Sequence, residues 1–332
     1  MSEKTMIETK TMTYREAVSE ALWEEMERDE RIFIMGEEVG VWGGTYAVTR
    51  GFYDHFGAKR VRDTPIAEQA IVGVAVGAAM NGLRPVAEIM TINFAFLALD
   101  AIVNSAAKVR YMFGGQFTVP LVIRTTTGGG RQLAATHSHA PEPIFAHFPG
   151  IYVVTPSTPA DAKGLLKSAL RDDNPVLFVE HSTLYQTRGE VPSEPDYLLP
   201  LGKSDVKRAG TDVTLVGYSK MVQVALQAAE VLERQGISAE VIDLRCLRPL
   251  DLEPVFESFK KTNHAVVVEE ALPYFNVSGE IAARIQDEVF DWMDAPVKRV
   301  NAEDVPLPYN RELEQNALPN VEKVIRAVKS IL

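Results

Sequence analysis

The sequence predicts an α/β protein built from two doubly wound domains, and three observations lead to this prediction. Strand-like and helix-like segments alternate along most of the 332 residues. The strand-like segments are almost wholly apolar, which is typical of parallel strands covered by helices on both faces. A segment without periodicity, which contains three prolines, interrupts the alternation at 186–207. We therefore expect a first domain over 1–185, a linker over 186–207 and a second domain over 208–332.

Local patterns predict the elements of the first domain. A helix begins after Thr13, whose side chain suits the N-cap position. Another begins before Glu68, with Thr64 as its N-cap and Pro65 at its first helical position. The expected strands are 32–35, 86–90, 119–124, 151–154 and 176–179, and the expected helices are 13–28, 68–81, 94–111 and 159–171.

The second domain repeats the alternation three times. Each repeat has a short apolar run followed by a longer segment with helical spacing of its apolar residues, which favours a further parallel sheet. The expected strands are 213–216, 239–242 and 265–268, and the expected helices are 221–234, 252–260 and 277–289.

Composition and charge argue against several functional classes. The chain has 45 acidic and 34 basic residues, and basic side chains supply most of the affinity for a phosphate backbone, so no nucleic acid is expected as a partner. The single cysteine, Cys246, excludes an internal disulfide and suits a reducing compartment. The longest near-apolar run, 70–80, is shorter than the roughly 20 residues that cross a bilayer. We expect a soluble, cytoplasmic protein, with a mature organellar protein as the alternative.

Glu68 is a candidate catalytic acid. The helix that follows it is almost wholly apolar, so its carboxylate is expected to be poorly solvated, as functional carboxylates often are. The simpler interpretation is an acid that the helix dipole favours at this end. A capping box anchored on Thr64 would need its acid at Ala67, so capping does not explain Glu68. The residues alone leave both interpretations open.

Histidines and glycines after the strand at 119–124 give a second signal. Histidine carries protons near neutral pH, which makes His137 a candidate. His137, His139 and His147 could also suggest a metal site, but no cysteine or well-spaced carboxylate completes a ligand set. The triple glycine 128–130 is not followed by the Lys-Ser/Thr of a phosphate loop, so we interpret it as a mobile loop over the site.

Glu68 also begins a longer pattern. Glu68, Gly73, Val74, Gly77 and Ala78 are spaced as in the Glu-x4-Gly-apolar-x-x-Gly-apolar pattern that thiamine-diphosphate enzymes carry, and the chain resembles that family here. Further segments resemble, in the same order, the beta subunit of the decarboxylating component of pyruvate dehydrogenase: GEEV at 36–39, DTPI at 63–66, GLRP at 82–85, NSAAK at 104–108, DDNP at 172–175, KTNH at 261–264 and VPLPY at 305–309.

The resemblance implies roles for three side chains. It implies that Glu68 hydrogen-bonds a ring nitrogen of the cofactor's aminopyrimidine, on a helix that packs across a subunit interface. It implies that Phe94 packs on the aminopyrimidine, although without the resemblance Phe94 would be a core aromatic. It places His137 where the lipoyl group arrives and protons move, and leaves His139 as local structure.

The resemblance also implies a structural potassium ion. The helix expected at 159–171 ends in carbonyl groups that lack partners, and such carbonyls with a nearby carboxylate can hold a cation. Without the resemblance, the acidic turn after this helix would be a solvated loop. The implied ligands are Leu121, Ala169, Leu170, Asp172 and Asn174.

Half of a thiamine site is missing from the chain. Thiamine-diphosphate enzymes hold the diphosphate through a metal bound by a Gly-Asp-Gly … Asn-Asn motif, and neither part occurs here. The resemblance therefore implies an alpha subunit that holds most of the Mg²⁺ site in an α2β2 assembly. It also implies pyruvate as substrate and the lipoyl group of dihydrolipoyl acetyltransferase as acceptor, on the way to acetyl-CoA.

Two segments depart from the family pattern and leave the substrate open. Residues 125–132 are rich in threonine and glycine, and 269–271 lack the Gly-Trp of many pyruvate-type relatives. The nearest alternative is the beta subunit of a branched-chain 2-oxo acid or acetoin dehydrogenase. A transketolase or deoxyxylulose-phosphate synthase fragment and a non-enzymatic α/β docking subunit are the others.

Overall fold

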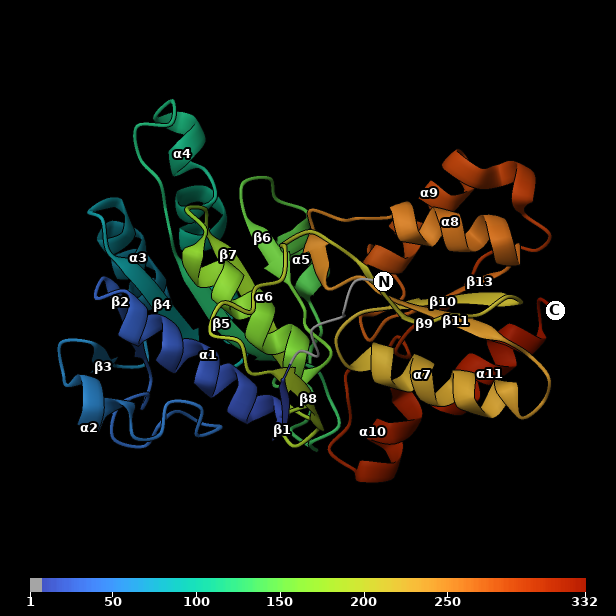
Figure 1. Cartoon of the computed structure of the whole chain (residues 1–332), viewed down its shortest axis with the longest axis horizontal. Coiled ribbons are helices and arrows are strands. Elements are labelled where there is room, and N and C mark those ends of the chain that lie inside the picture. Colours follow the sequence, from blue (N-terminus) through green and yellow to red (C-terminus); the bar gives the residue numbers. More distant parts are fainter. Residues whose placement is uncertain (1–7) are drawn as a thin grey trace.

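Two sheets organise the chain into two α/β domains that lie side by side (Figure 1). The computed structural model describes residues 8–332. The first sheet has seven strands in the order β12-β6-β7-β5-β4-β2-β3, and all its pairs are parallel except β12 with β6. Its strands are β2 (Ile32–Gly36), β3 (Val61–Asp63), β4 (Arg84–Ile89), β5 (Val122–Thr127), β6 (Tyr152–Val154), β7 (Val176–His181) and β12 (Cys246–Arg248).

Helices cover both faces of the first sheet because every second residue of a strand points to the same face. Ile32 and Ile34 pack beneath the paired helices α1 and α6, whereas Phe33 and Met35 pack with α3. Thr13 caps α1 through a capping box with Glu16, which confirms the expected start of that helix. The helices are α1 (Tyr14–Arg28), α2 (Phe52–Phe56), α3 (Glu68–Met80), the 3₁₀ helix η1 (Phe94–Ala98), the π-helix η2 (Ala101–Ala106), α4 (Val109–Met112), α5 (Glu142–Ala146) and α6 (Pro159–Arg171).

The second sheet has five strands in the order β14-β13-β10-β11-β9, with only β9 antiparallel to its neighbour. Helices α7 and α11 cover one face, and α8 and α9 cover the other (Figure 1). The strands are β9 (Asp205–Arg208), β10 (Val213–Gly217), β11 (Ala239–Asp243), β13 (Ala265–Val268) and β14 (Lys298–Val300). The helices are α7 (Lys220–Glu233), α8 (Glu253–Thr262), α9 (Val277–Val289), η3 (Phe290–Trp292), α10 (Arg311–Ala317) and α11 (Val321–Lys329).

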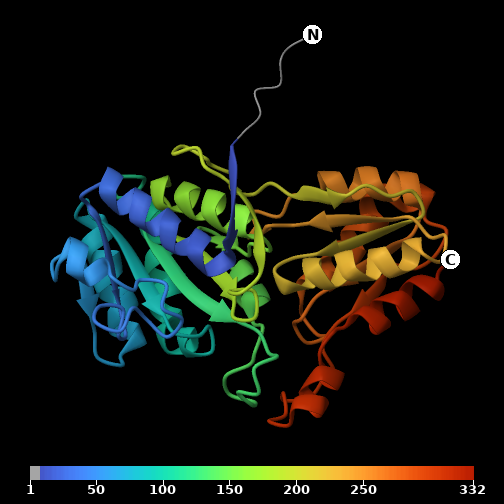
Figure 2. The same cartoon turned by 60° about the horizontal axis from the view of Figure 1, so that its bottom comes forward.

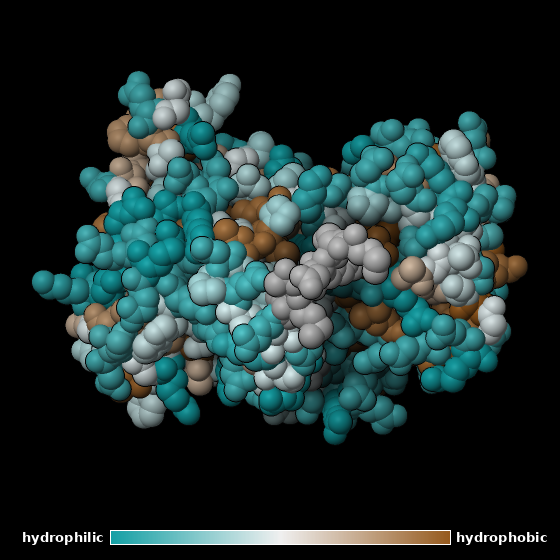
Figure 3. All heavy atoms as spheres, viewed as in Figure 1, coloured by the Kyte–Doolittle hydropathy of each residue, from teal (hydrophilic) through white to brown (hydrophobic). Residues whose placement is uncertain are grey.

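The two domains share one hydrophobic core. The cluster on the α3 side of the first sheet continues into the α8 and α9 side of the second. In Figure 3 hydrophobic residues gather where the two domains meet, while the outer helices are mostly hydrophilic. Strand β12, although it follows β11 in sequence, completes the first sheet, so the chain crosses between the domains more than once. In the part of the chain that the structure describes, no helix has the length and apolar character needed to cross a membrane.

The single helix expected over 94–111 is wrong. The segment is divided into η1, η2 and α4. Ala101, Ile102 and Val103 are consecutive and all buried. The middle of the segment adopts the wider turns of a π-helix, which the spacing of apolar residues does not distinguish from an α-helix.

The expected linker also contains regular structure. Strand β8 (Arg188–Pro192) pairs antiparallel with β1 (Thr9–Thr13), and β9 begins at Asp205. The missing N–H of Pro192 is tolerated because this two-stranded ribbon consists of edge strands.

Strand β5 also begins three residues later than expected, at Val122. The domain boundaries at 1–185, 186–207 and 208–332 stay a proposal.

Candidate active site

The carboxyl ends of the first sheet's parallel strands bring the candidate residues to one edge. Glu37 follows β2, and residues 91–94 follow β4. The Gly-rich segment follows β5, and His181 ends β7. Ligands of open α/β sheets bind at this edge, because the loops that leave the strands converge there.

Glu68 is the first residue of α3, and its side chain is 3% exposed. The expected cap by Thr64 is wrong, because the helix starts later with Ala67 as its N-cap. The backbone N–H of Thr64 donates to the carbonyl of Gly36 at 2.9 Å, which extends the strand-like path beyond β3. The carboxylate of Glu68 therefore lies directly at the positive end of the helix dipole.

A second buried carboxylate, Glu37, lies beside Glu68. Burial raises the pKa of Glu37, and the negative charge of Glu68 raises it further. Within residues 8–332 neither carboxylate has a hydrogen-bond partner, so both are available to a group from outside the chain. Glu37 is not among the site residues predicted from the sequence, although an acid directly after an apolar strand is a signal that could have predicted it.

The structure brings Phe94 and His137 together, whereas the roles that the resemblance implies for them stay a proposal. Their rings meet edge to face, with centroids 5.3 Å apart. Helix α3 packs on η1, so Glu68 and Phe94 lie on neighbouring elements. His137 is exposed, and its Nδ1 lies 2.9 Å from Oγ1 of Thr136. His139 is structural in this arrangement, because its Nδ1 lies 2.6 Å from the amide nitrogen of Asn93.

His137 belongs to a loop of residues 128–139, which we call the histidine loop. The loop is closed at its base because Gly128 N–H and the Thr127 hydroxyl both donate to the carbonyl of His139, at 3.2 Å each. Its first half is also hydrogen-bonded to glutamates of the second domain. These contacts argue against the mobile loop expected from the triple glycine.

Four residues of the implied potassium site, Ala169, Leu170, Asp172 and Asn174, lie in or just after the last turn of α6. The implied carbonyls do not lack partners, because that of Leu121 accepts from Val176 N–H at 2.8 Å and that of Ala169 from Asp172 N–H at 3.3 Å. The carbonyl of Leu170 does not lack a partner, because Nε of Arg84 donates to it at 2.9 Å. Arg84 also donates to the carbonyl of Asp172, as its buried guanidinium requires acceptors. Oδ1 of Asp172 accepts from the backbone and side chain of Asn174, at 2.8 and 2.7 Å. Carbonyl oxygens accept two partners, so these residues still fit a cation, which stays a proposal.

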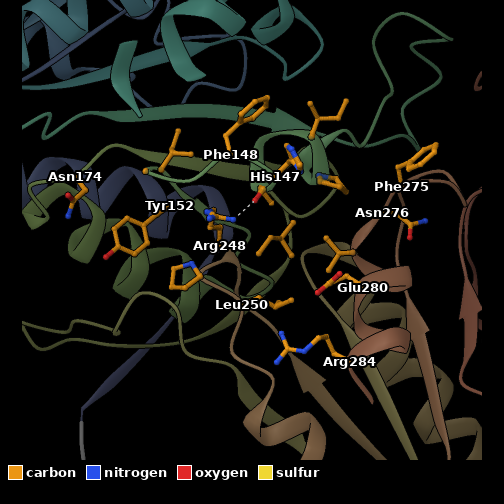
Figure 4. Close-up of a pocket in the computed structure, with 18 residues that line it drawn as sticks. His147, Phe148, Tyr152, Asn174, Arg248, Leu250, Phe275, Asn276, Glu280 and Arg284 are labelled. Atoms are coloured by element: carbon orange, nitrogen blue, oxygen red, sulfur yellow. Dashed lines mark hydrogen bonds between the residues drawn. The ribbon is translucent and has the colours of Figure 1, made fainter. Parts of the chain in front are cut away.

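A large cleft lies between the domains, away from Glu68 and His137 (Figure 4). Its volume is about 1140 Å³. Arg248 points into it and donates to the carbonyl of Ala146 at 2.9 Å. Neither Glu68, Phe94 nor His137 lines this cleft, so we assign the candidate active site to the strand ends instead.

The outer face of α3 is apolar and has no partner within the described residues. Val74 is 59% exposed, and Ile66, just before the helix, is 82% exposed. A Cβ atom added at Gly73 or Gly77 would meet no atom within 4 Å in the described chain. Nothing within residues 8–332 therefore explains why two glycines occupy this face.

Comparison with known proteins gives two family matches that together span most of the chain. Residues 10–188 match the pyrimidine-binding domain of transketolase, and residues 202–324 match its C-terminal domain. Among solved structures, a split-gene transketolase described as an inactive β4 tetramer covers 97% of this chain and 98% of its own, with a TM-score of 0.78 and 27% identity. The transketolase of Campylobacter jejuni shares the fold, with a TM-score of 0.70 and 16% identity over 97% of this chain and 47% of its own.

Curated relatives are more similar in sequence. A pyruvate dehydrogenase E1 component subunit beta of Rhizobium meliloti is 51% identical over 98% of this chain and 70% of its own length. The mitochondrial E1 beta subunits of Caenorhabditis elegans and Bos taurus are 48% and 47% identical, each over 97% of this chain and over 93% and 90% of their own lengths. The chain therefore belongs to the family of pyruvate dehydrogenase E1 component beta subunits, with the two-domain α/β fold of transketolases.

Proposed function

We propose that the chain is the beta subunit of an α2β2 thiamine-diphosphate-dependent pyruvate dehydrogenase. The enzyme would decarboxylate pyruvate and acetylate the lipoyl group of dihydrolipoyl acetyltransferase, in the cytoplasm. The observation that carries the proposal is the gathering of Glu68, Phe94 and His137 at one edge of the first sheet, in a chain of this family. Thiamine diphosphate, when bound, supplies the electron sink for the carbanion left by carbon dioxide.

The residues at the strand ends fit the aminopyrimidine half of that cofactor. The carboxylate of Glu68 is buried and free of partners within the described residues, so it can share a proton with a ring nitrogen. Glu37 lies close enough for the negative charge of Glu68 to add to burial in raising the pKa of the Glu37 carboxyl. The partly buried ring of Phe94 offers a flat apolar surface for an aromatic heterocycle.

His137 is exposed at the open side of the same site. Opening the dithiolane of a lipoyl group produces a thiolate, which needs a proton. An imidazole can supply a proton at neutral pH, and the contact with Phe94 holds the ring near the reacting centre. We assign proton transfer during lipoyl acetylation to His137.

The outer face of α3 supports a subunit interface. Two exposed glycines in a helix cost roughly 1 kcal/mol each in helix stability. Such a cost is offset when a partner helix packs closely against the glycines, as an alpha subunit would in the proposed assembly. Exposed Val74 and Ile66 add apolar area to the same surface.

Metal ions divide between the two subunits in this proposal. No group of three or more His, Cys, Asp or Glu side chains in residues 8–332 could hold a metal ion. We assign the Mg²⁺ that holds the diphosphate to the alpha subunit, and potassium to the turn at Asp172. A higher melting temperature in potassium than in lithium, lost in Asp172→Ala, is the expected sign of the potassium site.

Reconstitution with the cognate alpha subunit tests the proposed function. We expect the pair to bind thiamine diphosphate and to decarboxylate pyruvate faster than 2-oxoisovalerate or acetoin. A preference for 2-oxoisovalerate or acetoin would move the chain to the branched-chain or acetoin enzymes. Cofactor binding without turnover of any 2-oxo acid or of acetoin would contradict the enzymatic role. Tight cofactor binding by this chain alone would contradict the half-site.

A further inference from the structure

The histidine loop is held from outside its own domain. The loop lies beside α10 of the second domain (Figure 2). Gly129 N–H donates to Oε1 of Glu270 at 2.6 Å. Gly130 N–H donates to Oε1 of Glu314 at 2.9 Å, and Gln132 N–H lies 3.2 and 3.1 Å from the two oxygens of the same carboxylate. Two carboxylates of the second domain therefore bind three amides of the loop, those of Gly129, Gly130 and Gln132.

Both anchoring carboxylates are buried, which strengthens their hydrogen bonds. Glu314 is 0% exposed and Glu270 is 8% exposed. Hydrogen bonds from N–H groups to a carboxylate in such surroundings are stronger than those between neutral groups. Loss of Glu270 would leave the buried amide of Gly129 without its acceptor, and loss of Glu314 would remove the acceptor of the part-buried Gly130 and Gln132 amides.

A buried histidine orients Glu270. His181 accepts at Nδ1 from the backbone N–H of Thr183 at 3.2 Å, so its Nε2 carries the proton. That Nε2 donates to Oε2 of Glu270 at 2.9 Å. Burial raises the pKa of Glu270, but His181 and the amide of Gly129 outweigh it and lower the pKa overall. The carboxylate is therefore kept charged and aimed at the loop.

The glycines of the loop are explained by this contact. A Cβ atom at Gly128, where φ is +85°, would lie 2.1 Å from Nε2 of His181. A Cβ atom at Gly129 would lie 2.6 Å from Cδ1 of Leu307. The triple glycine thus allows His181 and the second domain to approach the loop backbone. A phosphate-binding role is not needed to explain these glycines.

The anchors are not required to hold the domains together. Asp161 of α6 forms ion pairs across the junction with Arg245 at 2.7 Å and with Lys207 at 2.6 Å. Strand β12 also completes the first sheet. The domains would stay joined without Glu314, so its contacts serve the loop.

We infer that Glu270 and Glu314 are positioning residues, which hold the histidine loop so that His137 faces the incoming lipoyl group. The inference rests on the proposed function of His137. The two segments that depart from the family pattern, 125–132 and 269–271, meet in this contact. The anchored loop is therefore a joint feature of this chain's two domains.

The test uses the reconstituted α2β2 enzyme carrying Glu314→Ala, Glu314→Gln or Glu270→Ala. Trypsin cleavage after the exposed Arg131, followed by the mass of this chain, measures the loop directly and needs no activity. We expect cleavage about tenfold faster in both alanine variants, from the loss of hydrogen bonds to a charged group. Glu314→Gln keeps an acceptor oxygen and should stay near wild type. Glu312→Ala, an exposed glutamate on the same helix, is the matched control.

Two activity assays complete the test. Overall activity with the acetyltransferase and NAD should fall about tenfold in the alanine variants, while decarboxylation with an artificial electron acceptor stays within about twofold of wild type. An unchanged rate of cleavage after Arg131 in the alanine variants would overturn the inference that Glu270 and Glu314 hold the histidine loop. Faster cleavage with both activities unchanged would overturn the positioning role. A wild-type enzyme without pyruvate turnover would instead refute the proposed function, and trypsin would still decide the anchor.

Discussion

The two sheets treat the acids at their strand ends differently. In the first sheet, Glu37 and Glu68 are buried without hydrogen bonds from residues 8–332. In the second, Glu269 after β13 is also buried, yet it accepts from the N–H groups of Val277 and Ser278 at the start of α9, at 3.1 and 2.8 Å. The hydroxyl of Tyr218 donates to it as well, at 3.0 Å.

The difference separates structural acids from functional ones. A buried charge without partners costs several kcal/mol, so a fold that needs an acid only for stability supplies its partners. The second domain does so for Glu269. The first domain supplies no hydrogen-bond partners for Glu37 and Glu68, which is expected if a cofactor and another subunit supply them. Substitutions at the two kinds of acid should therefore have opposite effects.

Glu68→Gln tests the comparison with the largest expected effect. A neutral amide cannot share a proton with the aminopyrimidine, so we expect turnover of the reconstituted enzyme to fall by about 100- to 1000-fold. Assembly should be unchanged and thermal stability should not fall, because the carboxylate has no partner in the described chain to lose. Steady-state kinetics with pyruvate and a melting curve measure both.

Glu269→Gln is the matched control in the second domain. Its amide would leave part of the α9 and Tyr218 network unsatisfied, so the free energy of unfolding should fall by roughly 1–3 kcal/mol. Activity per folded enzyme should persist. If Glu68→Gln kept more than half of wild-type activity, Glu68 would be only an acid favoured by the helix dipole.

Glu142, at the start of α5, is a third buried acid, and it should make the free energy of unfolding depend on pH. It is 1% exposed, and burial raises its pKa from 4.5 to about 8, although a hydrogen bond with Thr127 opposes this. The folded chain thus holds a proton that the unfolded chain releases above pH 4.5. The contribution of this proton to the free energy of unfolding is fully present below pH 4.5 and is lost as the pH rises through about 8.

Glu142→Gln should remove this pH dependence. Relative to the variant, the wild type should lose roughly 4 kcal/mol of unfolding free energy between pH 5 and 9. Urea unfolding at a series of pH values measures the difference, with the exposed Glu312→Gln as control. A constant difference across this range would mean that Glu142 is ionised in the folded chain.

His137→Ala separates two steps of the proposed reaction. Decarboxylation with an artificial electron acceptor should be largely retained, because in the proposed reaction Glu68 and not the histidine activates the cofactor. Overall activity with the acetyltransferase and NAD should fall by about tenfold, since the thiolate of the opened lipoyl ring loses its proton donor. Equal losses in both assays would make His137 a residue that orders the site, and His139→Ala is the comparison.

Local patterns in the sequence predicted much of the fold but less of the site. Residues such as Thr13 act within one turn of their own position, so the start of α1 was predictable. The residues alone made Glu68 and His137 candidates, and the resemblance supplied Phe94 and the roles of all three. The π-helix and the β1–β8 ribbon depend on packing between distant segments. The hydrogen bond between Glu270 and Gly129 was not predictable either, because the two residues are 141 positions apart in the sequence.

Gly73→Ala and Gly77→Ala test the open side of the first domain with the smallest expected effects. Both glycines lie on the exposed face of α3, and an added Cβ would meet nothing in the described chain. Each substitution should stabilise the isolated chain by about 0.5–1 kcal/mol, because alanine restricts the unfolded chain and favours the helix.

The same substitutions should weaken assembly. In the proposed α2β2 enzyme a partner backbone approaches α3 closely, so each added methyl group would raise the dissociation constant for the alpha subunit by roughly tenfold. Chemical unfolding of the single chain and titration with the alpha subunit measure the two effects separately. Gly236→Ala, at a glycine outside α3 with a positive φ of +81°, should destabilise the chain without affecting assembly. Stabilisation of both the chain and the complex would mean that no partner packs against these glycines.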